Sequence, residues 1–107
     1  MKNAKKKKLE SKGWKVGSAA EFLGLSREES EFVQMKLDLA RFLKGKRLRK
    51  NFSQVDLAKH LKSSQSRVAK MERGDPSVSM DLLIHSLLSL GATRKELAKA
   101  INASAVP

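Results

Sequence analysis

The sequence predicts an all-α protein of five helices preceded by a short helical extension. Two patterns carry this prediction. Apolar residues recur at spacings of three and four in successive segments after Ser26, as they do on one face of a helix. The form Ser/Thr-x-x-Glu, which caps helix N-termini, occurs at Ser18, Ser26 and Thr93. No segment alternates between apolar and polar residues for long enough to predict a strand.

The first 25 residues are expected to contain a tail and a small docking element. Residues 1–12 hold six Lys and little that could be buried, so a basic disordered tail is expected there. Within residues 13–25, the capping form at Ser18 and a C-terminal stop at Gly24 outline one or two helical turns that carry Phe22. We interpret residues 13–25 as an N-terminal docking extension.

A long helix is expected to begin after Ser26, with acidic residues in its first turn, where the helix dipole favours them. Its apolar stripe consists of Phe32, Met35, Leu39, Phe42 and Leu43. Its C-terminal end, KGKRLRK from Lys44 to Lys50, has five cations in seven residues. That is more charge than the dipole requires, and the segment is either a phosphate-contacting or a merely solvated face.

Two short helical patterns follow, separated by a polar break. Ser53 can cap the first, whose apolar residues on or near one face are Val55, Leu57, Ala58 and Leu61. Ser64 can cap the second, in which Val68 and Met71 resume the apolar spacing until Gly74 stops it.

Two further helices complete the expected domain, residues 26–103, before a C-terminal tail, residues 104–107. Ser79 can cap the first, which ends at Gly91 and has an apolar stripe of Leu82, Leu83, Leu87, Leu88 and Leu90. Thr93 opens the second, which runs through Ile101. The leucine stripe is expected to be mostly core, with a few of its residues and the last helix available for a two-fold dimer contact.

Composition limits the class of partner. The chain has 23 Lys and Arg against 11 Asp and Glu, a net charge of +12, which makes nucleic acid the leading partner and an anionic membrane surface the second. It has no cysteine, no apolar h-region after its Lys-rich start, and no apolar run long enough for a membrane span. We therefore expect a soluble cytoplasmic protein that does not enter membranes.

No catalytic or cofactor site is expected. His60 and His85 have no second ligand at metal-binding spacing, and the acidic group at 28–31 fits helix-start electrostatics. Neither a phosphate-binding loop nor a dinucleotide-binding fingerprint is present. The sequence indicates a non-enzymatic protein without metal or cofactor.

The two short helices and the turn between them form a helix-turn-helix pattern, in which the second helix enters the DNA major groove. Such a helix needs polar side chains at its start and an apolar back. Gln65, Ser66, Arg67 and Lys70 provide the polar side chains, while Val68, Ala69 and Met71 can face inward. The pattern predicts a protein that contacts bases in double-stranded DNA.

The segment resembles the lambda-repressor-like, or Xre-type, helix-turn-helix family. The matching residues are Ser53-Gln54, Leu57-Ala58, Leu61, Ser64-Gln65-Ser66, Val68 and Glu72-Arg73-Gly74, with weaker matches from about Leu39 to Ile101. Lys62 departs from the family, which usually has Gly there, and Ser63 stands where a small apolar residue is usual. Either the turn is altered or Lys62 tolerates a left-handed conformation that costs about 1 kcal/mol.

The resemblance implies roles for individual residues. Gln65, Ser66 and Lys70 match base-contacting positions, and Arg67 matches a position that contacts either a base or a phosphate. Gln54 matches a phosphate-contacting position at a helix N-terminus, and the other phosphate candidates are Ser53, Ser64, Lys44, Lys46 and Lys62. Glu72 matches a buried carboxylate that pairs with an arginine of the preceding long helix, here Arg47, which implies a structural role for both.

The front of the chain narrows the resemblance. WKVGSAAEFLGLSREE, from Trp14 to Glu29, followed by a long helix and the helix-turn-helix, is similar to antitoxins of the HigA type. That resemblance implies an antitoxin that binds a RelE/HigB-like toxin and represses its own operon. A homodimer formed through the leucine stripe and the last helix would predict a palindromic operator. A stand-alone Xre-type regulator and, with the Lys-rich tail as its main argument, a nucleic-acid-associated adaptor remain as alternatives.

Overall fold

The computed structural model describes residue 24 and residues 26–102. The expected basic tail, nearly all of the docking extension and the C-terminal tail lie outside the described residues. The chain divides into two compact units, one ending at Gln34 and the other beginning at Met35. The second unit contains all the residues proposed to contact DNA.

The all-α prediction is confirmed, because the described residues form helices and contain no strand. In chain order the helices are α3 (Arg27–Arg49), α4 (Gln54–Leu61), α5 (Gln65–Arg73), α6 (Met80–Ser89) and α7 (Arg94–Asn102). None of the described helices is long and apolar enough to cross a membrane.

Side-chain caps fix where these helices begin. The hydroxyls of Ser64 and Ser79 accept hydrogen bonds from the backbone N–H groups of Arg67 and Leu82 at 3.1 Å. Reciprocal capping boxes join Ser26 to Glu29, Ser53 to Asp56, and Thr93 to Glu96. The Ser53 box uses Asp rather than Glu, so the sequence pattern that found the other two did not include it.

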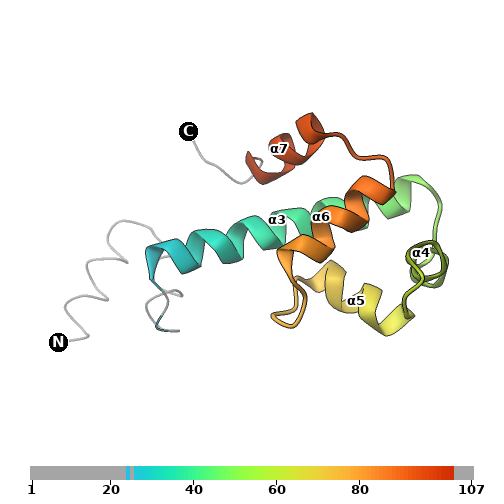
Figure 1. Ribbon diagram of the computed structural model, residues 1–107, viewed down its shortest axis with the longest axis horizontal. Helices are drawn as coiled ribbons and strands as arrows, with labels where there is room; N and C mark the ends of the chain where they lie inside the picture. The colour runs from blue at the N-terminus through green and yellow to red at the C-terminus, as the bar shows by residue number, and fades with distance from the viewer. Residues whose placement is uncertain (1–23, 25, 103–107) are drawn as a thin grey trace. The chain divides into compact units, whose positions relative to one another are not determined.

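The core of the second unit lies where the C-terminal half of α3 meets α4, α5 and α6. Its fully buried side chains are Leu39, Leu43, Leu57, Val68, Met71, Leu83 and Leu87. In Figure 1, α4 and α5 lie below α6 and this half of α3, and α7 lies on the opposite side. The arrangement leaves the outer faces of α4 and α5 open to solvent.

Three residues assigned to apolar stripes are exposed, so those assignments are wrong: Phe32 at 48%, Val55 at 48% and Leu88 at 45%. A helix advances about 100° per residue, which puts Val55 off the side that Leu57 and Ala58 share. Leu88 comes one residue after buried Leu87, so the same turn of about 100° takes it away from the buried side. Phe32 belongs to the unit that ends at Gln34, whereas Leu39 and Leu43 belong to the second unit.

Candidate nucleic-acid interface

The turn between α4 and α5 depends on a left-handed residue. Lys62 has φ 56° and ψ 47°, and the N–H of Ser63 then donates to the carbonyl of Ala58 at 2.8 Å. Lys62 therefore adopts a left-handed conformation, the second of the two expectations for this position.

The solvent side of α5 is polar and cationic. Ser66, Lys70 and Arg73 are exposed and follow one another at spacings of four and three residues, so they lie on one side of the helix. Val68 and Met71 on the opposite side are buried in the core. Ala69 is half-buried beside the exposed side, where its small side chain adds little bulk.

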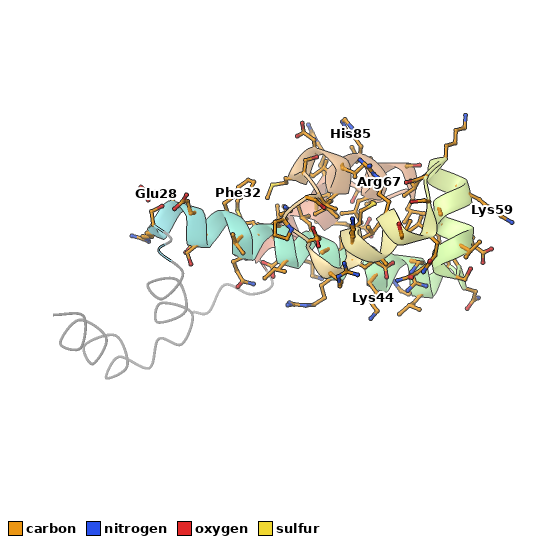
Figure 2. All side chains as sticks on the ribbon, turned by 90° about the horizontal axis from the view of Figure 1, so that it is seen from below. Glu28, Phe32, Lys44, Lys59, Arg67 and His85 are labelled. Carbon is orange, nitrogen blue, oxygen red and sulfur yellow. The ribbon has the colours of Figure 1, made fainter. Side chains whose placement is uncertain are left out.

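Gln65 and Arg67 lie on opposite flanks of α5. Two residues apart on a helix, they are separated by about 160° around its axis. The Nε2 group of Gln65 donates to Oε1 of Gln54 on α4 at 2.7 Å. Arg67 instead lines an open cleft with His85 of α6, and Figure 2 shows Arg67 on that side of the molecule.

A buried ion pair lies behind Gln54. Arg47 of α3 donates through Nε to Oε2 of Glu72 and through Nη2 to Oε1 at 3.1 Å, and the two side chains are only 8% and 3% exposed. Nε2 of Gln54 donates to the same Oε1 at 3.1 Å. Nη1 of Arg47 also donates to the carbonyl of Phe52 at 2.8 Å. The pair thus joins α3, the segment before α4, and α5.

The residues predicted to contact phosphate fall into two groups. Ser53 and Ser64 are the exposed N-caps of α4 and α5, and Lys44 and Lys62 are exposed, as phosphate contact requires. Lys46 differs from them, because its ammonium lies 3.8 Å from the carboxylate of Glu96 on α7 and 5.9 Å from the ring centre of Phe42. We leave Lys46 out of the proposed interface for that reason.

One exposed cation of α5 escaped the sequence interpretation. The sequence pattern includes Arg73 only in Glu72-Arg73-Gly74, which closes the helix-turn-helix pattern. Its guanidinium is exposed and forms a loose ion pair with Asp75, 3.6 Å away. Its position three residues after Lys70 is the signal that could have identified it.

The N-terminus of α4 carries a charged carboxylate. The N–H of Ser53 and, to a smaller extent, its hydroxyl hold the pKa of the Asp56 carboxyl below its ordinary value. Asp56 therefore stays ionised at neutral pH and stabilises the N-terminal end of the helix dipole. Its interaction with Ser53 fixes the start of α4, where Gln54 is the first helical residue.

The two histidines lie in the same cleft. His60 and His85 both line this open space of about 480 Å³, together with Arg67 and Ser86. Nε2 of His60 lies 3.0 Å from Oγ of Ser89. Among residues 24 and 26–102 no group of three potential metal ligands occurs.

α4, the turn at Lys62 and α5 have the arrangement of a helix-turn-helix. Residues 43–84, from the last turns of α3 into α6, match the family model described as Helix-turn-helix. The match covers about two fifths of the chain and supports a DNA-binding transcriptional regulator of the Xre-like kind. No curated protein and no solved structure matches the chain.

Proposed function

We propose that this protein is a sequence-specific DNA-binding repressor that inserts α5 into the major groove. The observation that carries the proposal is the hydrogen bond between Gln65 and Gln54, which holds a base-contacting amide at the N-terminal end of α5. A helix-turn-helix protein contacts base edges from this end of its second helix. The exposed side of α5, with Ser66 and Lys70, continues the same surface.

The base contacts follow from the side-chain chemistry. Gln65 can pair with adenine, which presents an acceptor and a donor in the major groove, and Lys70 can donate to the acceptors of guanine. Ser66 can donate to or accept from either base. Arg67, on the flank of α5, contacts a base or a phosphate beside the groove.

The phosphate contacts surround this surface. Gln54, Ser53 and Ser64 lie at the N-termini of α4 and α5, where the helix dipole favours an anion. Lys44 and Lys62 add cationic side chains. These contacts position the protein without selecting a sequence.

The protein is proposed to act as a homodimer in the cytoplasm. A two-fold dimer would present two α5 helices about 34 Å apart and so bind a palindromic operator. Leu88, exposed on α6, is the apolar residue that we propose for the dimer contact.

We further propose that the protein is the antitoxin of a type II toxin-antitoxin operon, binds a RelE/HigB-like toxin and represses its own promoter. This part is supported by the resemblance of Trp14 to Glu29 to HigA-type antitoxins. Ser26 to Glu29, the described end of that segment, forms the expected capping box. Without a toxin, the same interface would serve a stand-alone regulator.

Binding to the upstream DNA tests the repressor. Fluorescence anisotropy would compare a duplex of the protein's own upstream region with a scrambled duplex at about 150 mM salt, with an expected preference of about a thousandfold or more. Gln65→Ala should remove the sequence preference at one base pair, whereas Lys95→Ala on α7 should leave the sequence preference unchanged. Equal affinity for both duplexes would refute the repressor and favour a nucleic-acid adaptor.

The toxin requires a separate test. A gene beside this one that encodes a RelE-like protein would be co-expressed with the full chain and with a chain lacking residues 14–25. We expect co-purification with the full chain only, while both chains still bind the operator. Toxin retention by the shortened chain would contradict the docking role of residues 14–25.

A further inference from the structure

In the hydrogen bonds that join α3, α4 and α5, the donor and the acceptor of each bond are fixed. Arg47 can only donate, and the carboxylate of Glu72 can only accept. Because Oε1 of Glu72 receives a bond at 3.1 Å from Gln54, the amide of Gln54 must present its Nε2 group to Glu72 and its Oε1 atom to α5. In water a glutamine amide can adopt either of these two orientations, and the carboxylate excludes one of them.

The orientation of Gln54 determines that of Gln65. Since Gln54 presents an oxygen, Gln65 must approach it with Nε2, as the 2.7 Å bond requires. Gln65 then retains its Oε1 atom and its second N–H, a set that complements the N6 donor and N7 acceptor of adenine. In the opposite orientation Gln65 would retain two N–H groups, which complement the N7 and O6 acceptors of guanine.

We infer that Glu72 is a specificity-determining positioning residue, whose buried carboxylate makes Gln65 prefer adenine to guanine through Gln54. Glu72 itself is buried in its pair with Arg47, so its effect passes through the two amides. The inference rests on the proposed function, because it requires α5 to contact bases. It gives the ion pair a role in recognition in addition to its role in joining the helices.

Glu72→Gln tests the direction of the bonds with little change in shape. Arg47 donates to both oxygens of Glu72, so the introduced amide loses one of these two bonds whichever way it turns. With its nitrogen in the place of Oε1 it donates to Gln54, which then turns its own oxygen inward and its N–H groups toward Gln65. The base pair to be varied is the one at which Gln65→Ala loses its preference. There the affinity ratio of the adenine duplex to the guanine duplex should fall by about tenfold or more.

Gln54→Leu is a second variant, and it leaves the ion pair intact. It removes the connection to Glu72, so Gln65 can adopt both orientations, and the adenine-to-guanine ratio should move toward one without reversing. Glu96→Gln, which removes the same charge from α7, is the matched control and should leave the ratio unchanged. Thermal unfolding followed by circular dichroism identifies any variant that does not fold. If Glu72→Gln does not fold, the adenine-to-guanine ratio of Gln54→Leu tests the inference.

Each folded variant is titrated by fluorescence anisotropy with four duplexes, which differ only in the base pair at this position. A changed ratio in Glu72→Gln or Gln54→Leu, with Glu96→Gln unchanged, supports the inference. An equal loss of affinity on all four duplexes assigns Glu72 a purely structural role and overturns it. A wild-type protein that binds every duplex alike refutes the proposed function itself, which is a distinct result.

Discussion

Arg47 on α3 and Glu72 on α5 form a two-pronged buried ion pair, although 25 residues separate them in the chain. Each charge is removed from water, and each is compensated by the other and by the bonds to Phe52 and Gln54. A buried charge without its partner is strongly destabilising, whereas replacing both partners by apolar residues is often tolerated.

Arg47→Met should lower the free energy of unfolding by about 3–5 kcal/mol, because it leaves the Glu72 carboxylate buried and unpaired. The double variant Arg47→Met with Glu72→Met should recover most of that loss. Urea unfolding followed by circular dichroism measures both. If the two single losses simply add in the double variant, the pair does not act as a unit and this account of it is wrong.

Lys62→Gly should stabilise the protein by about 1 kcal/mol, because glycine adopts the left-handed conformation of this turn without steric cost. Lys62→Ala removes the same charge but keeps the backbone strain, so it separates the two effects. We expect the gain with glycine only. Equal stability of the two variants in urea would show that the backbone at position 62 is not strained.

The helices and their starts follow from local rules, and the sequence shows them clearly. Serine and threonine caps and the spacing of apolar residues predict each described helix, because both depend on residues within one or two turns. The sides that become buried depend on neighbouring helices instead. Spacing alone therefore places Val55 and Leu88 in apolar stripes, although both side chains are exposed.

In the candidate site, too, some features follow from local sequence and others depend on contacts between helices. The exposure of Gln65, Ser66 and Lys70 follows from their positions at the start and outer side of α5. The family resemblance supplied the match between Arg47 and Glu72. The bonds that join Gln65 to Gln54 and Gln54 to Glu72 connect side chains 11 and 18 residues apart, and no spacing rule within one helix predicts them.

Gly74→Ala should destabilise the protein by more than Gly91→Ala, although both glycines have positive φ, 67° and 92°. A Cβ atom at Gly74 would lie 2.6 Å from Cδ2 of Leu37, whereas one at Gly91 would meet nothing within 4 Å. Gly91→Ala should therefore show only the backbone cost of about 1 kcal/mol.

A double variant isolates the contact at Gly74. Leu37→Ala removes the methyl group that the new Cβ would meet, so adding it to Gly74→Ala should cost less than the sum of the single losses. Thermal and urea unfolding measure the free energies of unfolding of the wild type, the two single variants and the double variant. Additive losses would mean that the left-handed backbone alone explains the need for Gly74.

Acid should destabilise the protein partly through three carboxylates, two in capping boxes and one in the turn after α5. The N–H of Ser53 lowers the pKa of Asp56, the N–H of Ser77 lowers that of Asp75, and the N–H of Thr93 lowers that of Glu96. A carboxyl whose folded pKa lies below its unfolded value contributes its full stabilisation above the unfolded pKa, at about 4. The contribution is lost as the pH falls through the lower, folded pKa.

Asp56→Asn should flatten the decline in unfolding free energy as the pH falls below about 4, because one of these groups no longer titrates. Ser64→Ala is the matched control, since Ser64 caps α5 without a carboxylate partner of this kind. It should cost about 1 kcal/mol at every pH and leave the slope unchanged. An unchanged slope in Asp56→Asn would contradict the assigned role of Asp56.

Arg73→Ala should weaken binding to all duplexes alike, because an arginine at the exposed C-terminal end of α5 is expected to contact phosphate rather than a base edge. Each neutralised phosphate releases counterions, so the slope of log affinity against log salt should become shallower by about one. Lys95→Ala removes one exposed cation from α7 and should leave the slope unchanged. Anisotropy titrations at several salt concentrations measure both variants. A loss confined to one base pair would instead make Arg73 a base-contacting residue, and an unchanged slope would place it outside the interface.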